Sequence, residues 1–185
     1  MKLKSLSLSE LVEVGKGGGK GCRRETYWKP VTEEVLSRRL SIKKIIAFGK
    51  LAGSSQVWEV IIKAKAKRLS VKRLLEIGRL AQHWSVWEKI ASYAKLADAS
   101  EEELLEIGVG ADRSDTWRRI APFLKLGKRS NSKLIEICNI ADDYDLRRQI
   151  FEKLKLKGLS SDKMIELGKQ SNDWSIWHKI LPSVI

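Results

Sequence analysis

The chain has 185 residues, of which 43% are hydrophobic, and this is enough apolar material for a continuous core. No run of about eighteen apolar residues occurs, which excludes a membrane-spanning helix. Its 36 lysines and arginines outnumber 23 aspartates and glutamates, and the formal net charge of +13 favours a polyanionic partner, such as nucleic acid or an acidic protein surface.

The compartment follows from cysteine usage and from the first residues. Cys22 and Cys138 lie far apart in the sequence, so we expect no disulfide, and the N-terminus lacks the apolar core of a secretory signal. Both features predict a cytoplasmic protein. Abundant Lys, Glu and Ile with few Gln, Asn and Thr are typical of heat-adapted proteins.

One pattern recurs six times: Leu-Ser, three variable residues, two aliphatics, usually Glu, an aliphatic and Gly, then Trp and, three residues later, Ile. A looser copy starts at Leu6, with an insertion at 17–20, and the others start at Leu40, Leu69, Ala99, Arg129 and Leu159, in steps of 29, 30, 30 and 30. A fixed period of this length predicts a repeat architecture, and we expect residues 1–185 to form one domain.

Each copy predicts two helices. Serines suited to be N-caps open the first helix: Ser7, Ser41, Ser70, Ser100, Ser130 and Ser160. A second column of candidate caps opens the second helix: Thr26, Ser85, Asp115, Asp145 and Ser175. Aliphatic stripes follow both columns. The expected fold is all-α, a right-handed superhelix (solenoid) of about six helix pairs of about 30 residues each.

Two positions of the repeat carry residues that are uncommon there, and each needs its own explanation. Glycines occupy a helix-interior position (Gly15, Gly49, Gly78, Gly108 and Gly168), which costs about 1 kcal/mol each against Ala and predicts a close approach of two helix backbones. Tryptophans recur at Trp28, Trp58, Trp87, Trp117 and Trp177 and are expected in the core, the alternative being stacking platforms for bases. In the fifth copy Cys138 and Arg147 replace them. We interpret Cys138 as a small buried residue rather than a nucleophile.

The first basic cluster lies in the Gly- and Lys-rich insertion at 15–24. It contains Lys16, Lys20, Arg23 and Arg24 among five glycines. The segment does not fit a phosphate-binding P-loop, because Gly21 stands where Ser or Thr is needed and no strand precedes it. Non-specific contact with phosphodiesters is one interpretation, and a plain solvated loop is the other.

The second basic cluster lies between the second and third copies. Six positive charges fall within eleven residues: Lys63, Lys65, Lys67, Arg68, Lys72 and Arg73. Favourable interaction with helix dipoles accounts for one or two of them, not six. Residues 1–98 carry 21 Lys and Arg against nine Asp and Glu, whereas residues 99–185 carry 15 against 14. We therefore predict that a basic stripe in the N-terminal half binds a phosphate backbone.

At the turn inside the helix pair, some copies have an aromatic residue and others do not. Trp84, Tyr144 and Trp174 lie there, while Ser55 and Ser114 hold the equivalent positions in other copies. Packing therefore does not require an aromatic side chain, and partner contact is an alternative to local packing over the turn.

Nothing in the pattern predicts an enzyme, a cofactor or a metal site. Catalysis needs a distinct set of residues in one place, whereas these columns repeat the same residue in every copy. His83 and His178 fall in different contexts, so neither a metal site nor a catalytic triad is expected.

On these repeats the chain resembles α-solenoids of the HEAT and tetratricopeptide kind over essentially its whole length. The opening Leu-Ser, the Ile of the first helix and the short turn are also similar to TAL-effector-type DNA-binding repeats. The chain lacks their Pro and their longer period, and the variable turns (53–55, 82–84, 112–114 and 143–144) predict no particular base preference.

Two functions follow as hypotheses. The first is a nucleic-acid-binding solenoid, for DNA or RNA, that uses the two basic clusters. The second is a protein-interaction scaffold that binds an acidic protein surface or uses Trp84, Tyr144 and Trp174 as anchors. The apolar last residues, 180–185, further predict that the last helix pair either forms a homodimer or folds back on the fifth copy.

Overall fold

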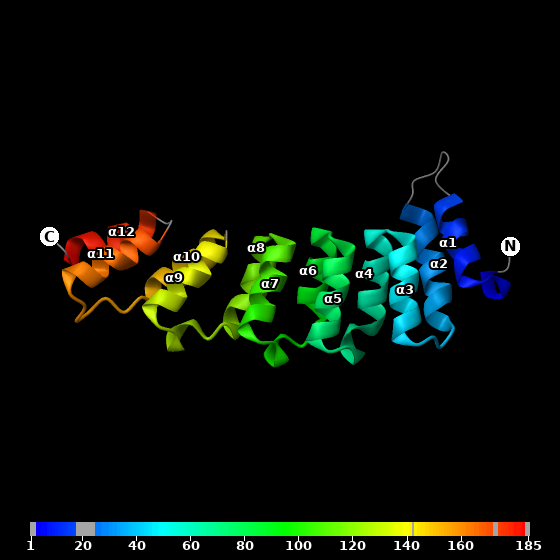
Figure 1. Ribbon diagram of the computed structural model, residues 1–185, viewed down its shortest axis with the longest axis horizontal. Coiled ribbons are helices and arrows are strands. Elements are labelled where there is room, and N and C mark those ends of the chain that lie inside the picture. Colours follow the sequence, from blue (N-terminus) through cyan, green and yellow to red (C-terminus); the bar gives the residue numbers. More distant parts are fainter. Residues whose placement is uncertain (1–2, 18–24, 142, 172–173, 184–185) are drawn as a thin grey trace. The chain divides into compact units, whose positions relative to one another are not determined.

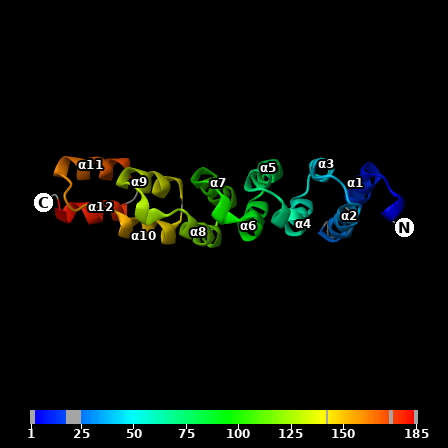
Figure 2. The same cartoon turned by 90° about the horizontal axis from the view of Figure 1, so that it is seen from below.

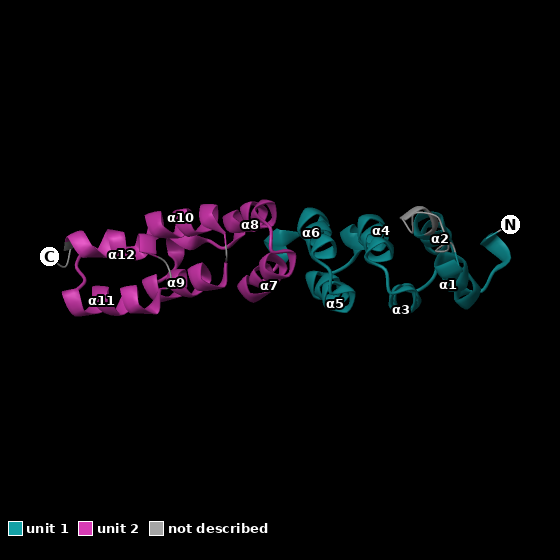
Figure 3. Ribbon diagram, turned by 90° about the horizontal axis from the view of Figure 1, so that it is seen from above, with its two compact units in different colours: residues 1–98 teal, residues 99–185 magenta. Residues whose placement is uncertain are grey.

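The structure is a computed structural model that describes residues 3–17, 25–141, 143–171 and 174–183. Within these residues the chain is all-α, with twelve α-helices (Figure 1), as the sequence predicts. Their contacts divide it into two compact units, residues 1–98 and 99–185 (Figure 3). The prediction of one domain stays a prediction.

Unit 1 contains six α-helices and three short 3₁₀ turns among its described residues. They are η1 (Leu3–Ser5), α1 (Leu8–Gly17), α2 (Glu25–Ser37), α3 (Ile42–Ala52), α4 (Ser55–Lys65), η2 (Ala66–Arg68), α5 (Val71–Ala81), α6 (Trp84–Tyr93) and η3 (Leu96–Asp98).

Unit 2 is built in the same manner over its own described residues. Its elements are α7 (Glu101–Ala111), α8 (Ser114–Ile120), η4 (Ala121–Phe123), η5 (Leu126–Lys128), α9 (Asn131–Ile140), α10 (Tyr144–Lys153), α11 (Ser161–Gln170), α12 (Trp174–Ile180) and η6 (Leu181–Ser183).

The helices pack in sequential pairs. In unit 1 the odd-numbered helix of each pair also contacts the next odd-numbered helix, and α2, α4 and α6 contact one another in order, so two layers form (Figure 2). In unit 2, α7, α9 and α11 form one layer and α8, α10 and α12 the other. The apolar stripes of both helices of a pair are thereby buried.

Serine caps fix where the first helix of each pair begins. Ser41, Ser70, Ser100, Ser130 and Ser160 each accept a hydrogen bond from the backbone N–H three residues later. Ser7 and Glu10 form a capping box, with the Glu10 N–H donating to Ser7 Oγ at 3.3 Å and the Ser7 N–H donating to Glu10 Oε2 at 2.7 Å. These predicted caps are confirmed.

The predicted caps of the second helices are wrong by two residues. Thr26, Ser85, Asp115, Asp145 and Ser175 lie inside the first turn, because α2, α6, α8, α10 and α12 begin at Glu25, Trp84, Ser114, Tyr144 and Trp174. His83 Nδ1 caps α6 by accepting from the Ser85 N–H at 3.3 Å, and buried Asp143 caps α10 by accepting from the Leu146 N–H at 2.8 Å. The caps of α6 and α10 are therefore His83 and Asp143, each two residues before the serine or aspartate that the repeat pattern predicted.

The glycine column faces the tryptophan column of the same pair. A Cβ on Gly15, Gly49, Gly78, Gly108 or Gly168 would lie only 2.2–2.7 Å from ring atoms of Trp28, Trp58, Trp87, Trp117 or Trp177, respectively. The neighbour that requires glycine is thus an indole ring, and the predicted close approach of two backbones is wrong in that respect. Trp28, Trp58, Trp87 and Trp117 are at most 7% exposed, which confirms that they belong to the core.

The fifth copy changes both members of this contact together. Cys138 on α9 and Arg147 on α10 occupy the glycine and tryptophan positions, with the same spacing of nine residues as Gly108 and Trp117. The Cys138 side chain is buried, as predicted, and Arg147 Nε donates to the Ala141 carbonyl at 3.2 Å. The α9–α10 pair therefore lacks the indole ring and has a side chain, that of Cys138, where the other pairs have glycine.

Apolar burial is continuous along each unit. The core of the α3–α6 segment contains Ile45, Phe48, Ile61, Leu74 and Ile90, each at most 2% exposed. None of the helices in the described parts of the chain combines the length and the apolarity needed to cross a bilayer.

One polar side chain occupies an apolar position of the core. Thr116 on α8 is fully buried at the position held by Val57 in α4 and Val86 in α6. Its hydroxyl has no hydrogen-bond partner among the described residues. Thr32, equally buried on α2, instead donates to the Trp28 carbonyl at 2.6 Å.

We predict that Thr116→Val raises the free energy of unfolding by about 1 kcal/mol, because valine keeps the shape and removes an unsatisfied buried hydroxyl. Thr32→Val is the matched control and should lower it by about 0.5–1 kcal/mol, since a formed hydrogen bond is lost. Urea denaturation of both variants measures the difference. Shifts of the same sign would contradict this account of Thr116.

The Gly–Trp contact predicts that Gly108→Ala is destabilising by about 1–3 kcal/mol, through overpacking against the Trp117 ring. Helix propensity alone predicts the opposite, a gain of about 1 kcal/mol. Gly17→Ala at the end of α1 is the control, because a Cβ there meets no atom of the described residues within 4 Å. Thermal unfolding of both variants separates the two effects.

Transplanting the pair from the fifth copy tests the coupling directly. Gly108→Cys combined with Trp117→Arg should be more stable than the sum of the two single changes, with a coupling energy of about 1–3 kcal/mol. A double-mutant cycle by urea denaturation measures this energy. Simple additivity would show that the two positions do not depend on each other.

Candidate nucleic-acid interface

One end of unit 1 concentrates positive charge. The links between successive helix pairs lie at this end, and the turns inside the pairs lie at the other (Figure 1). We call the first end the junction edge, and define it by ten described basic residues: Arg39, Lys43, Lys44, Lys63, Lys65, Lys67, Arg68, Lys72, Arg73 and Lys95. Arg38 lies at the same end but pairs with Glu34 at 2.9 Å and donates to the Leu3 and Leu6 carbonyls.

The structure brings the second predicted cluster together on this edge. Lys63 and Lys65 lie in the last turn of α4, and Lys67 and Arg68 lie on η2. Lys72 and Arg73 follow in the first turn of α5. Because η2 is only three residues long, it holds the end of α4 close to the start of α5. All six side chains are exposed except Lys65, which is half-buried.

The predicted clusters did not include four members of the edge: Arg39, Lys43, Lys44 and Lys95. Lys43 and Lys44 are exposed in the first turn of α3, and α3 packs against α5. They lie 29 residues before Lys72 and Arg73, in the same columns of the repeat. That register was the signal that could have identified them.

The charges of the junction edge are almost unpaired. Among the described residues, Arg73 makes its single ion pair, with Glu76 at 2.6 Å, on an exposed face. Lys43, Lys44, Lys72 and Arg73 moreover lie in helix first turns, where the helix dipole disfavours cations. The helix dipole therefore does not account for this placement.

Unit 2 shows the neutralised version of the same edge. The first turn of α7 carries Glu101, Glu102 and Glu103. Glu101 contacts Arg129 Nη2 at 2.5 Å and Lys133 Nζ at 3.3 Å. A hydrogen bond from Lys133 to Glu136, assisted by one to Glu101, raises the pKa of the lysine above its ordinary value. Glu101 thus pairs with two cations, whereas the first turns of α3 and α5 carry no acidic residue.

Of the first predicted cluster the structure describes Lys16, which lies apart from the second cluster. Lys16 is at the C-terminal end of α1, beside Glu13 at 3.3 Å, and therefore at the turn end of the helices. At about 1.5 Å per residue, the eleven residues of α4 place the two ends about 16 Å apart. Lys20, Arg23 and Arg24 lie outside the described residues.

The variable aromatics are exposed where the sequence placed them, near the turns. Trp84, Tyr144 and Trp174 are the first residues of α6, α10 and α12, and they are 44%, 78% and 68% exposed. The Trp84 ring stacks on His83 at 5.7 Å between centroids, and the Trp174 ring meets His178 edge-on at 4.9 Å. More than half of the Tyr144 and Trp174 side-chain surface is therefore exposed, and less than half of that of Trp84.

The last helix pair buries part of its apolar sequence within the chain. Ile176 and Ile180 are at most 1% exposed, and α12 contacts both α11 and α10. Lys179 Nζ donates to the Phe151 carbonyl, and burial lowers the pKa of this lysine. These contacts agree with folding back on the fifth copy, and a homodimer stays a prediction.

No group of His, Cys, Asp and Glu in the described residues is arranged to hold a metal ion. Comparison of the chain with protein-family models, with curated proteins and with solved structures gave no match. The fold and the charge of the junction edge are therefore the observations on which a function is proposed.

Proposed function

We propose that this chain is a non-catalytic helical-repeat protein that binds nucleic acid, DNA or RNA, through the junction edge of unit 1. One observation carries the proposal: ten basic residues occupy this edge with one ion pair among the described residues, whereas Glu101 contacts two cations at the corresponding position in unit 2. Clustered cations that lack acidic partners gain most from a phosphate backbone, whose counterions they release.

The binding mode follows from which side chains are accessible. Lysine and arginine on helix ends contact phosphates and set the position of the ligand without reading its sequence. Trp28, Trp58 and Trp87 are buried, so these rings are closed to base stacking. We therefore propose backbone contact with little sequence preference.

We also propose that the helix pairs are repeats of a right-handed α-solenoid, as the period of 29–30 residues predicts. The Gly–Trp contact supports this, because it recurs in both units at one place in the pair. The layered packing within each unit supports it as well. In such a stack each pair contacts only its neighbours.

A second candidate function is a protein-interaction scaffold. The exposure of Trp84, Tyr144 and Trp174 favours it, because large aromatic side chains are typical anchors of protein interfaces. Under this hypothesis the rings serve recognition rather than folding.

For the first proposal we predict that binding weakens steeply with salt and depends on which lysines are removed. Lys63, Lys65 and Lys67, changed together to Gln, should flatten the slope of log K against log salt by about two to three, because each phosphate contact contributes about 0.9. The measurement is fluorescence anisotropy with a labelled 20-base-pair duplex, from 50 to 200 mM NaCl.

The matched control is the same change at Lys153, Lys155 and Lys157. These exposed lysines have the same alternating spacing at a junction in unit 2. The control removes equal charge and should change the slope by less than one. Equal effects of the two triple variants would reject a specific role for the junction edge, and absence of binding to duplex and single strands would reject nucleic-acid binding.

For the second candidate we predict that Tyr144→Ala and Trp174→Ala each change the free energy of unfolding by less than about 0.5 kcal/mol, since their rings are mostly exposed. Trp117→Ala, by contrast, should cost about 3–5 kcal/mol. Urea denaturation compares the three variants. A large loss of stability from either exposed site would show that the ring packs locally and is not held for a partner.

A further inference from the structure

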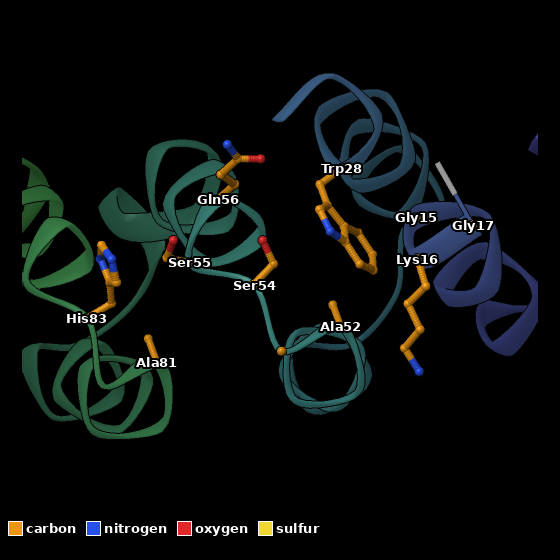
Figure 4. A pocket seen from close by; sticks show the side chains of 11 residues that line it. Gly15, Lys16, Gly17, Trp28, Ala52, Ser54, Ser55, Gln56, Ala81 and His83 are labelled. Carbon is orange, nitrogen blue, oxygen red and sulfur yellow. The ribbon is translucent and has the colours of Figure 1, made fainter. Parts of the chain in front are cut away.

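A groove of about 850 Å³ lies at the turn end of unit 1, away from the junction edge (Figure 4). The end of α1 and Trp28 form one side of it, the α3–α4 turn forms its centre, and His83 with Ala81 forms the other side. The groove therefore extends over three successive helix pairs.

Small residues at the α3–α4 turn keep this space open. Gly53, with a φ of +61°, ends α3 in the left-handed region, and Ser54 and Ser55 follow it. Ser55 is the first residue of α4, the position that holds Trp84 in α6 and Trp174 in α12. A large ring at Ser55 would occupy the groove, so its absence there creates the site.

One cation, Lys16, lines the groove, and two more hold the same position in the next two pairs. Lys16, Lys50 and Arg79 occupy the last turns of α1, α3 and α5, in one column of the repeat. Cations are favourable at helix C-termini, but Val109 in α7 shows that the fold does not require them. Glu13 pairs with Lys16 on the exposed side, and no carboxylate is among the described residues that line the groove.

Polar groups line the centre of the groove. Ser54, Ser55 and Gln56 are half-buried there. Ser54 is the N-cap of α4, but its side chain makes no capping hydrogen bond, unlike Ser41 at the start of α3. Hydroxyl, amide and first-turn N–H groups can therefore donate to the carbonyl oxygens of a bound chain.

Exposed apolar side chains adjoin the lining residues in sequence, and they distinguish between classes of ligand. Leu51, Leu80 and Trp84 are 60%, 37% and 44% exposed, next to the lining residues Ala52, Ala81 and His83. Exposed leucines contribute to binding by covering apolar side chains of a ligand, which a peptide has and a phosphate backbone lacks. Cations, donors and leucines together match an acidic peptide that also carries apolar residues.

We propose that this groove binds an extended acidic peptide segment of a partner protein. Its carboxylates pair with the Lys16, Lys50 and Arg79 row, and its backbone lies along Ser54–Gln56. Its apolar side chains contact Leu51, Leu80 and Trp84. The site is independent of nucleic-acid binding at the junction edge, and it gives the second candidate function a defined location in unit 1.

The test is an NMR titration of the full-length ¹⁵N-labelled chain with a twelve-residue peptide of alternating Glu and Leu. The amides of Ser54, Ser55 and Gln56 and the indole N–H of Trp84 should shift and saturate. A peptide of alternating Lys and Leu should bind at least tenfold more weakly, because the row of cations repels it.

Ser55→Trp tests the groove itself, because tryptophan occupies the corresponding position in α6 and α12 and is compatible with the helix start. We expect it to weaken binding of the acidic peptide at least tenfold, with an unchanged circular dichroism spectrum and unchanged duplex binding. Ser114→Trp, the same change at the first residue of α8, is the control and should leave peptide binding unchanged.

Three results would overturn the proposal: no saturating shifts at millimolar peptide, equal binding of the basic peptide, or full binding by Ser55→Trp. A twelve-nucleotide single strand that moves the same groove amides and displaces the peptide would assign the groove to nucleic acid instead. The junction-edge proposal is tested separately in the same NMR experiment. A DNA duplex should shift the amides of residues 63–73 and leave those of the groove unchanged.

Discussion

The contact between a helix glycine and an indole ring is the interaction on which the rest of the structure depends. The ring lies directly on the helix backbone at a position where a Cβ would be only 2.2–2.7 Å from its atoms, so the facing residue must be glycine. It also buries the largest apolar side chain available, at the centre of the pair. Five pairs contain this contact, at the same place in each pair.

The two units use this shared framework for different surface chemistry. Helix first turns are acidic in α7, where Glu101 holds Arg129 and Lys133, but basic in α3 and α5. Because surface columns do not take part in the Gly–Trp contact, they can change sign without disturbing the core. The basic column in unit 1 lowers helix stability through the dipole and charge repulsion, and a bound polyanion would reverse both effects.

Much of this structure could be predicted from sequence, because periodicity reports what is buried. The helix pairs, the serine caps of the first helices and the burial of Trp58 and Trp117 follow from it. Periodicity does not report which side chain caps a turn, and His83 and Asp143 were therefore missed as caps. Periodicity also does not show which side chain faces a helix glycine. It does not show that the small residues around Ser55 leave a groove, because the groove is lined by residues from several helices.

Basic residues were found only where they were dense in sequence. Six charges within eleven residues are conspicuous, whereas Lys43 and Lys44 join them only because α3 packs on α5. The separation of Lys16 from this group likewise follows from helix length and direction rather than from composition. Counting charges thus predicts the sign of the charge on a partner. Which basic residues lie close enough to bind it together depends on the fold.

The Cys138 and Arg147 exchange has a consequence for motion. The α9–α10 pair has no indole ring at its centre, so less apolar surface resists its separation than in the pairs on either side. In a chain whose pairs are held mainly by their neighbours, such a pair is where thermal opening starts. Deuterium would enter its amides before those of α7 and α8, and unit 2 would bend there under load while α7–α8 kept its form.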